Sequence, residues 1–240
     1  NDITYDKNKE TIFTKGSSKA KIRSRYSIET NDLFFYRNEK ILNSNKKSTF
    51  RDEDTKTLFN LEKFDFAIND EILKGEKILV ITDYNLPQSD KLFFNSSMFD
   101  LKNKSFIAKD IEIKFKKNIF DNLDNDPRLK GVSVRNKENI TTINKGIFTS
   151  CKKEGDCPPW VISAKKITHD KNKKLLIYND ALLKIYNVPV LYFPKFFHPD
   201  PTVKRQSGLL KPQFNNSNIL GSSFNIPYYH VLADNKDFTF

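Results

Sequence analysis

Cysteine and histidine are the residues of this chain whose types could support metal, redox or nucleophilic chemistry. There are two cysteines, Cys151 and Cys157, and three histidines, His169, His198 and His230. A zinc site takes about four ligands, and these histidines are scattered along the chain. The cysteine spacing also differs from the C-x-x-C of thioredoxin-like redox motifs. The sequence therefore favours a disulfide between Cys151 and Cys157 in an oxidising compartment, with two reduced thiols in a loop as the alternative.

One acidic segment has part of the spacing of a calcium-binding loop. Asn122, Asp124 and Asp126 alternate as the first ligands of such a loop do. However, Pro127 occupies the position that requires glycine, and Ser133 occupies the position of the bidentate glutamate. A solvated loop is the better interpretation, and we expect no metal site.

The sequence lacks the common signatures of an enzyme. It has no nucleophile elbow, no glycine-rich phosphate loop and no HExxH motif. His198 stands two residues before Asp200 among prolines, which is too local an arrangement to define a catalytic triad. We therefore expect no catalytic residues and no cofactor.

The net charge of +11 over 240 residues limits the choice of partners. A basic chain gains affinity for nucleic acid by neutralising phosphates. Here the lysines are scattered among asparagine, isoleucine and phenylalanine, a pattern that also fits a compositional bias of the source. A polyanionic ligand such as a phosphorylated glycolipid fits the same charge, and we expect no nucleic-acid partner.

The elements that must position these residues are strands. Few segments have helical periodicity, and no apolar run is long enough for a membrane-spanning helix. The first and last residues already have strand-like patterns, so we expect the sequence to be an excerpt of a longer chain. Four segments have the period-2 alternation or the apolar, β-branched composition of strands: residues 19–26, 77–82, 110–116 and 175–193, the last divided near Asn187.

Polar turns recur between these segments and form a loose internal repeat. Residues 3–9 reappear almost unchanged as residues 167–173, with weaker versions at 34–40 and 98–104. The turn-like clusters lie at residues 6–9, 37–40 and 170–173 within these repeats, and at residues 74–76 outside them. Successive hairpins of this kind stack into a jelly roll or an open β-taco, with an apolar interior between two sheets and edge strands that can pair with another protein.

The composition changes near residue 187. Six of the ten prolines fall between Pro189 and Pro227. Beyond them, residues 207–214, 215–218 and 219–229 have the patterns of strand, turn and strand. In the second strand an apolar face alternates with a small, polar one, as in a transmembrane β-barrel strand or a half-buried soluble hairpin. Pro212 and Pro227 fall inside these strands, on unpaired edges or at weakened seams, because proline cannot donate to the ladder.

Several motifs in this half of the chain resemble the LptD family of lipopolysaccharide-assembly proteins of Gram-negative outer membranes. They are TSC followed by W-x-I-x-A-x-x-I-x-H-D, then VPVLYFPKFFHPDP, KRQSGLLKP and IPYYHVLADNKDFT, in this order. The resemblance is dense over residues 149–240 and looser, at the level of the hairpin repeat, over residues 1–146.

The resemblance implies an all-β chain in three parts. Residues 1–186 would form a periplasmic β-jellyroll, residues 187–205 a connector, and residues 206–240 the first strands of an outer-membrane β-barrel. Such a jellyroll receives lipopolysaccharide from a periplasmic LptA-like bridge and passes it to a laterally opening barrel plugged by an LptE-like lipoprotein. The alternative is a periplasmic scaffold or bridge module without an insertion pore. A general diffusion porin is disfavoured, because a long soluble region precedes the first barrel-like strand.

The resemblance also implies roles for individual residues. Pro212 and Pro227 match prolines at the lateral seam of the barrel. Inward side chains would solvate acyl chains, with four candidates for this lining: Tyr36, Phe115, Tyr178 and Ile185.

The cysteines fit the family only in part. Cys151 matches a jellyroll cysteine that, in familiar members, bonds to a cysteine near the far end of the barrel. Cys157 departs from that pattern and offers Cys151 a local partner instead.

Overall fold

A computed structural model shows an all-β chain, which confirms the expected fold class. It describes residues 2–86, 89–114, 126–151, 159–199, 203, 207–210, 213–217, 221–233 and 235–240. The chain divides into two compact units, Asn1–His198 and Pro199–Phe240. Among the described residues, no helix is present that has the length and apolar character needed to cross a membrane.

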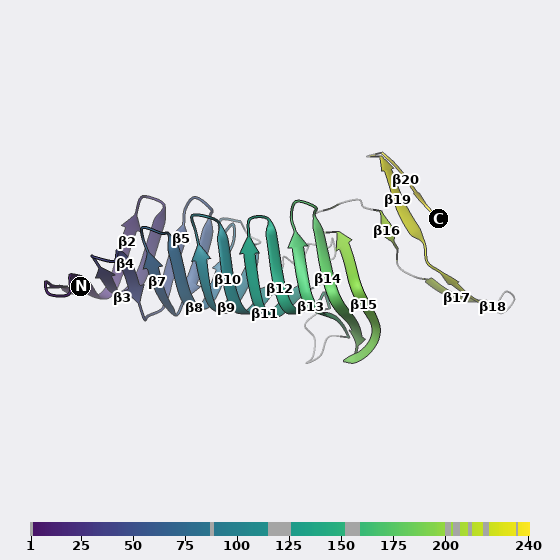
Figure 1. Ribbon diagram of the computed structural model, residues 1–240, viewed down its shortest axis with the longest axis horizontal. Coiled ribbons are helices and arrows are strands. Elements are labelled where there is room, and N and C mark those ends of the chain that lie inside the picture. The colour runs from purple at the N-terminus through teal and green to yellow at the C-terminus, as the bar shows by residue number, and fades with distance from the viewer. Residues whose placement is uncertain are drawn as a thin grey trace. The chain divides into compact units, whose positions relative to one another are not determined.

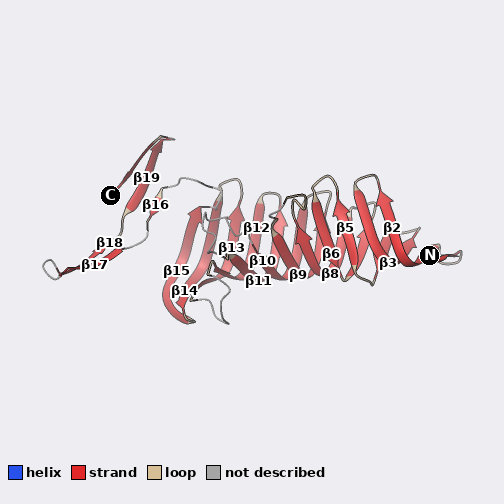
Figure 2. Ribbon diagram, turned by 180° about the vertical axis from the view of Figure 1, so that it is seen from behind, coloured by secondary structure: helices blue, strands red, loops and turns tan. Residues whose placement is uncertain are grey.

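The first unit is a stack of antiparallel hairpins (Figures 1 and 2). Its strands are β1 (Asp2–Asp6), β2 (Thr11–Ile22), β3 (Tyr26–Tyr36), β4 (Ile41–Ser44), β5 (Ser48–Asp52), β6 (Thr57–Leu61), β7 (Lys63–Ala67), β8 (Ile72–Ile81), β9 (Lys91–Asp100), β10 (Ser105–Lys114), β11 (Arg128–Lys137), β12 (Ile140–Thr149), β13 (Trp160–Asp170), β14 (Leu175–Ile185) and β15 (Val188–Pro199).

Most strands pair with their neighbours in sequence, and only β3 and β8 branch. One half of β3 pairs with β5 and the other half with β4. In the same way, β8 pairs with β7 over one half and with β6 over the other. Since β4 pairs with β7 and β5 with β6, these six strands close a ring of pairings. From β8 to β15 the order is strictly sequential.

Each long strand bends near its middle along a line that we call the crease. The ladder is interrupted there in every pair from β8 to β14, for example between Asn144↔Lys166 and Gly146↔Ala164. On alternate strands the residue at the break has a left-handed backbone, with φ of 47° at Lys77, 51° at Asp110, 50° at Lys145 and 51° at Asp180. The crease comprises Lys77, Asn95, Asp110, Val132, Lys145, Lys165 and Asp180, all of which are exposed.

The two halves of the bent strands face each other across the core. Phe66 pairs with Leu73 on one side of the crease, whereas Phe50 belongs to the other side, yet their ring centroids are 5.0 Å apart. Phe59 and Phe99 make a similar contact at 5.0 Å. The first unit is therefore a V-shaped pair of sheets with the crease at its apex, and we call the strand ends opposite the crease the two lips.

The bend reverses the parity of the inward-facing residues. Before the crease of β14 the inward residue is Tyr178, and after it the inward residue is Ala181, both with 0% exposure. The same spacing of three recurs on every strand from β8 to β14, as Gly75 and Ile78, Phe94 and Ser97, Ala108 and Ile111, Gly131 and Val134, Ile143 and Gly146, and Ala164 and Ile167.

The space beside the crease is tight. A Cβ atom built on Gly75, Gly131 or Gly146 would lie 2.5, 2.4 or 2.4 Å from a neighbouring side chain, which belongs to Leu61, Ile143 or Ile167 respectively. These are distances that real Cβ atoms do not reach, so glycine is required for the apolar side chains to interlock. The interior is therefore filled by the chain's own side chains.

The repeated turn has a physical basis. Asp6 Oδ1 accepts the backbone N–H groups of Asn8 and Lys9 at 3.0 and 3.1 Å. Asp170 Oδ1 accepts those of Asn172 and Lys173 at the same distances. An aspartate that caps its own turn in this way stabilises the reversal between strands. The expected turns at residues 6–9, 37–40 and 170–173 are confirmed.

Two expectations about the first unit were wrong. Residues 74–76, expected as a turn, lie inside β8, because the chain bends at the crease one residue later without reversing. Residues 187–205, expected as a connector, begin with β15, which pairs with β14 and ends the first unit. Tyr186 and Asn187, with φ of 46° and 66°, form a two-residue hairpin turn of type I′, which has positive φ at both central residues. The prolines of β15 are tolerated because this is an edge strand within the unit.

The second unit contains β16 (Gly208–Leu209), β17 (Gln213–Ser217), β18 (Gly221–Asn225), β19 (Tyr228–Ala233) and β20 (Lys236–Thr239). Within it, β17 pairs with β18, and β19 lies between β16 and β20. Residues 215–217, expected as part of a turn, continue β17 in register with β18. Pro227, expected inside a strand, lies between β18 and β19, and its carbonyl accepts the Leu210 N–H at 2.8 Å.

Candidate functional site

Tyr178 is the predicted lining residue that the structure buries in the interior. Its hydroxyl lies 3.0 Å from Nε2 of His198, and the two rings stack with centroids 5.4 Å apart. Burial raises the pKa of the Tyr178 hydroxyl. Phe196 packs against both rings. The core between the sheets thus ends in an aromatic cluster at β14 and β15.

The other predicted lining residues lie elsewhere. Beyond the bend of β3, the side chains of Leu33 and Phe35 contribute to the core. Tyr36 follows Phe35 in the strand, so its side chain is on the outer face, where it is half-buried. Ile185 has the inward parity but is the last residue of β14 and 44% exposed. Phe115 lies outside the described residues. A lipid-lining role for these four positions stays a prediction.

A cluster of charged residues joins the two lips at the amino-terminal part of the V. Arg25, in the turn between β2 and β3, donates from Nε and Nη2 to the two carboxylate oxygens of Asp52 at 3.1 and 3.0 Å. Both residues belong to one lip. From the same guanidinium, Nη1 donates to Oε2 of Glu71 at 3.2 Å, and Glu71 lies on the opposite lip, in the turn that leads into β8.

Further contacts complete this cluster. The Tyr26 hydroxyl donates to Oε2 of Glu71 at 2.8 Å, and Arg23 Nη1 donates to Oε1 at 2.9 Å. The Arg25 guanidinium also lies over the Tyr26 ring, 4.7 Å from its centroid, a favourable cation–π distance. We call Arg23, Arg25, Tyr26, Asp52 and Glu71 the clasp.

Electrostatics hold the clasp in its ionised form. Burial alone would raise the pKa of the Asp52 carboxyl, but the hydrogen bonds and the positive charge of Arg25 outweigh it and lower that pKa. Hydrogen bonding to Asp52 raises the pKa of Arg25. The Asp52 side chain is 2% exposed, so its charge depends on this bidentate partner.

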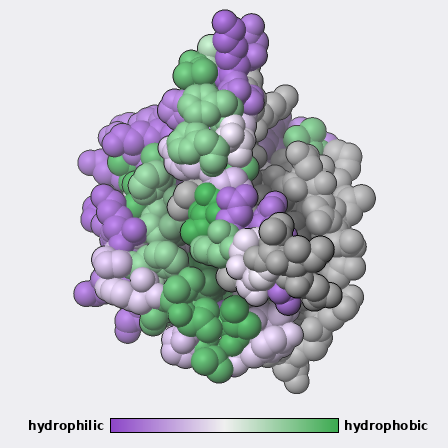
Figure 3. Space-filling model, turned by 90° about the vertical axis from the view of Figure 1, so that its right-hand side faces the viewer, coloured by the Kyte–Doolittle hydropathy of each residue, from purple (hydrophilic) through white to green (hydrophobic). Residues whose placement is uncertain are grey.

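Apolar surface gathers at the carboxyl-terminal end of the first unit. Figure 3, which views the molecule from the right-hand side of Figure 1, shows hydrophobic side chains gathered over part of the visible surface. β15 is apolar on both faces, unlike a half-buried strand of a soluble sheet. Its large exposed side chains are Val188, Val190, Leu191, Tyr192 and Phe197.

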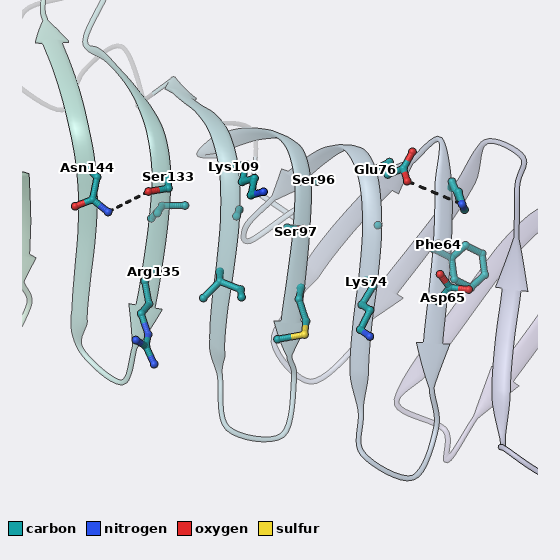
Figure 4. A pocket seen from close by; sticks show the side chains of 16 residues that line it. Phe64, Asp65, Lys74, Glu76, Ser96, Ser97, Lys109, Ser133, Arg135 and Asn144 are labelled. Atoms are coloured by element: carbon teal, nitrogen blue, oxygen red, sulfur yellow. Dashed lines mark hydrogen bonds and ion pairs between the residues drawn. The ribbon is translucent and has the colours of Figure 1, made fainter.

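A groove crosses the outer face of one sheet over β7 to β12 (Figure 4). Its volume is about 550 Å³, within the range of small-molecule sites. Lys74 of β8, Lys109 of β10 and Arg135 of β11 lie along it. The groove thus combines apolar and cationic groups outside the core.

The cysteines and prolines are only partly described. Cys151 follows β12, and its thiol sulfur lies 3.9 Å from the Trp160 carbonyl oxygen. Cys157 and Pro212 lie outside the described residues. The disulfide between Cys151 and Cys157 and the seam role of the two prolines stay predictions.

Sequence reasoning missed both the clasp and the groove. Arg23 and Arg25 place two arginines in one turn, whereas the turns at residues 7–10, 101–104 and 171–174 use lysine and asparagine, and this difference was a usable signal. The groove had no comparable signal, because its cations are separated by many residues and meet only through strand register.

Comparisons with known proteins give the chain its relatives. It is similar to LPS-assembly protein LptD of Polaromonas sp., with 36% identity over 102 residues, or 41% of this chain and 12% of the relative. The LptD of Pseudoalteromonas translucida is 38% identical over 92 residues, covering 38% of this chain and 12% of the relative. That of Acinetobacter baumannii is 34% identical over 109 residues, or 45% and 13%. No family model matches the chain. Each match therefore spans only a small part of the curated relative.

Proposed function

We propose that the chain is part of an LptD-type protein that assembles lipopolysaccharide at the outer membrane of a Gram-negative bacterium, because LptD proteins are 36–38% identical to it over 92–107 residues. Its first unit would carry the acyl chains between its two sheets, on the periplasmic side. The observation that carries the proposal is the continuous apolar interior of the V, to which strands from β3 to β15 contribute. No covalent chemistry is needed for this function.

The two ends of the stack support a direction of transfer. At the amino-terminal end, β1 is an edge strand with Ile3 73% exposed, which suits pairing with an LptA-like bridge protein. At the other end, the exposed apolar side chains of β15 suit delivery towards a membrane-embedded part. We propose that lipid moves along the interior from the β1 end to the β15 end.

The second unit would supply the first strands of the barrel, which an LptE-like lipoprotein would plug. Pro212 and Pro227 would weaken the lateral seam, since proline cannot donate to a ladder. Replacing both with residues that carry an N–H should then hinder release of lipid into the outer leaflet. Normal release in the double variant would contradict the seam.

Photo-crosslinking tests the interior route. A photoreactive residue at Ile113 or Leu176, which pack against the core, should capture lipopolysaccharide in cells. Lys130 and Lys166, exposed on the outer faces of β11 and β13, are the matched controls. Equal capture at inward and outward positions, or capture only at the lysines, would refute transport between the sheets.

The open edges also fit a second function, a scaffold or bridge module that joins β domains without a pore. Both β1 and β15 are terminal strands of the sheet order in the first unit. The same crosslinking separates the two functions, because a scaffold would capture neighbouring proteins at its edges and no lipid at Ile113 or Leu176.

A further inference from the structure

The outer groove has an apolar floor between cations. Strand register places Lys74 opposite Met98, Met98 opposite Ile107, and Ile107 opposite Arg135. These four residues therefore form one row across β8, β9, β10 and β11, on the face turned away from the core. Met98 is half-buried and Ile107 is 46% exposed, so an apolar strip of surface lies between the positively charged side chains of Lys74 and Arg135.

The next row explains why the surface is hollow. Ser96 and Ser133 flank Lys109 in register, and their small side chains leave space above the sheet. Figure 4 shows Ser96, Lys109 and Ser133 along the upper part of the groove, with Lys74 and Arg135 lower on either side. Three cations thus border one space.

The carboxylates of the groove are already engaged, whereas three of its four cations are not. Asp65 accepts a hydrogen bond from the Asn43 amide, and Glu76 pairs with Lys63 at 3.9 Å. Within the described part of the chain, Lys74, Lys109 and Arg135 form no ion pair. An anion bound here would accept charge-assisted hydrogen bonds from them.

We propose that this groove binds a phosphorylated amphiphile. The phosphate lies among Lys74, Lys109 and Arg135, and the apolar chain lies over Met98 and Ile107. Both parts of the ligand are needed, because the floor offers apolar contact and the rim offers charge. The site is on the outer face, so it does not depend on transport through the interior.

Met98 provides a site-specific probe, since it is the only methionine of the chain. With the methionine methyl group labelled with carbon-13, the 240-residue chain is titrated with dodecyl phosphate below its micelle concentration. We expect a saturable shift of the Met98 methyl signal. Inorganic phosphate has the charge without an apolar chain, and dodecyl maltoside has the apolar chain without a charge. Both should leave this signal nearly unchanged at the same concentrations.

Charge variants test the rim. The double variant Lys74→Gln/Arg135→Gln should lower the affinity for dodecyl phosphate about tenfold or more, because two charge-assisted contacts are lost. The control Lys171→Gln/Lys173→Gln removes the same charge from an exposed turn and should leave the affinity unchanged.

Four results would overturn the proposal. Equal binding of inorganic phosphate would mean a bare anion site, and equal binding of dodecyl maltoside would mean unspecific apolar contact. An equal loss in both double variants would mean a general charge effect. Tighter binding of an acidic peptide than of dodecyl phosphate would assign the groove to a protein partner.

Discussion

Arg25 Nη1 lies 3.2 Å from Oε2 of Glu71, although the two residues are 46 positions apart and belong to opposite lips of the V. The same guanidinium holds Asp52 on its own lip. The clasp therefore links the two lips directly at the amino-terminal part of the V.

Replacing Arg25 should destabilise the first unit strongly. Arg25→Ala leaves the Asp52 carboxylate buried without its partner, and we expect a loss of about 2–4 kcal/mol in the free energy of unfolding. Urea unfolding followed by the fluorescence of Trp160, the only tryptophan, measures it. Arg37→Ala is the control, because its pair with Glu10 is solvent-exposed and should contribute less than about 1 kcal/mol. Similar losses in both variants would contradict a special role for the clasp.

The contribution of Asp52 should depend on pH in the acid range. Its pKa is lower in the folded chain than its ordinary value of 3.8, so the folded state favours the ionised form. Its stabilisation is then complete above about pH 3.8 and is lost as the pH falls through the folded-state pKa. Unfolding of the chain and of Asp52→Asn at several pH values should show a difference that shrinks below pH 3.8. A difference independent of pH would show that the charge of Asp52 does not contribute.

Glycine should be accepted at the left-handed positions of the crease. Lys145 has φ of 50°, a conformation that costs roughly 1 kcal/mol with a side chain and little with glycine. We expect Lys145→Gly to be neutral or slightly stabilising and Lys145→Val to be destabilising in thermal unfolding. Lys165, opposite it at the crease, is absent from the residues with positive φ, so Lys165→Gly should destabilise. The reverse order of the two glycine variants would disprove this account of the bend.

A single methyl group beside the crease should disturb the core. In Gly146→Ala the new Cβ would lie 2.4 Å from Cδ1 of Ile167, and we expect a loss of about 1–3 kcal/mol. Adding Ile167→Ala to Gly146→Ala removes the clashing atoms, so the double variant should lose less than the sum of the single losses. Double-mutant-cycle analysis of denaturant unfolding tests this coupling. Additive losses would mean that the two residues do not press against each other.

Local patterns in the sequence determined much of the fold. Alternation over residues 110–116 predicts a strand, and its described part, residues 110–114, is the second half of β10, with Ile111 and Ile113 turned inward. The repeated aspartate turns predict the hairpin stack, because their hydrogen bonds join residues only two or three positions apart. The motifs of the carboxyl-terminal half predicted the similarity to LptD proteins that the comparisons found.

Only the tertiary structure decided which face each residue occupies and which distant residues meet. The crease reverses the inward parity within a strand, so a simple period-2 alternation cannot give the face of a residue on both sides of the bend, as Tyr178 and Ala181 show on β14. Lysine at positions 77 and 145 gives no sign in the sequence of the left-handed backbone that causes this reversal. The contact between Arg25 and Glu71 and the gathering of Lys74, Lys109 and Arg135 depend on folding and strand register. The sequence thus encodes the strands and turns locally, whereas the bend of the whole sheet creates the clasp, the interior and the groove.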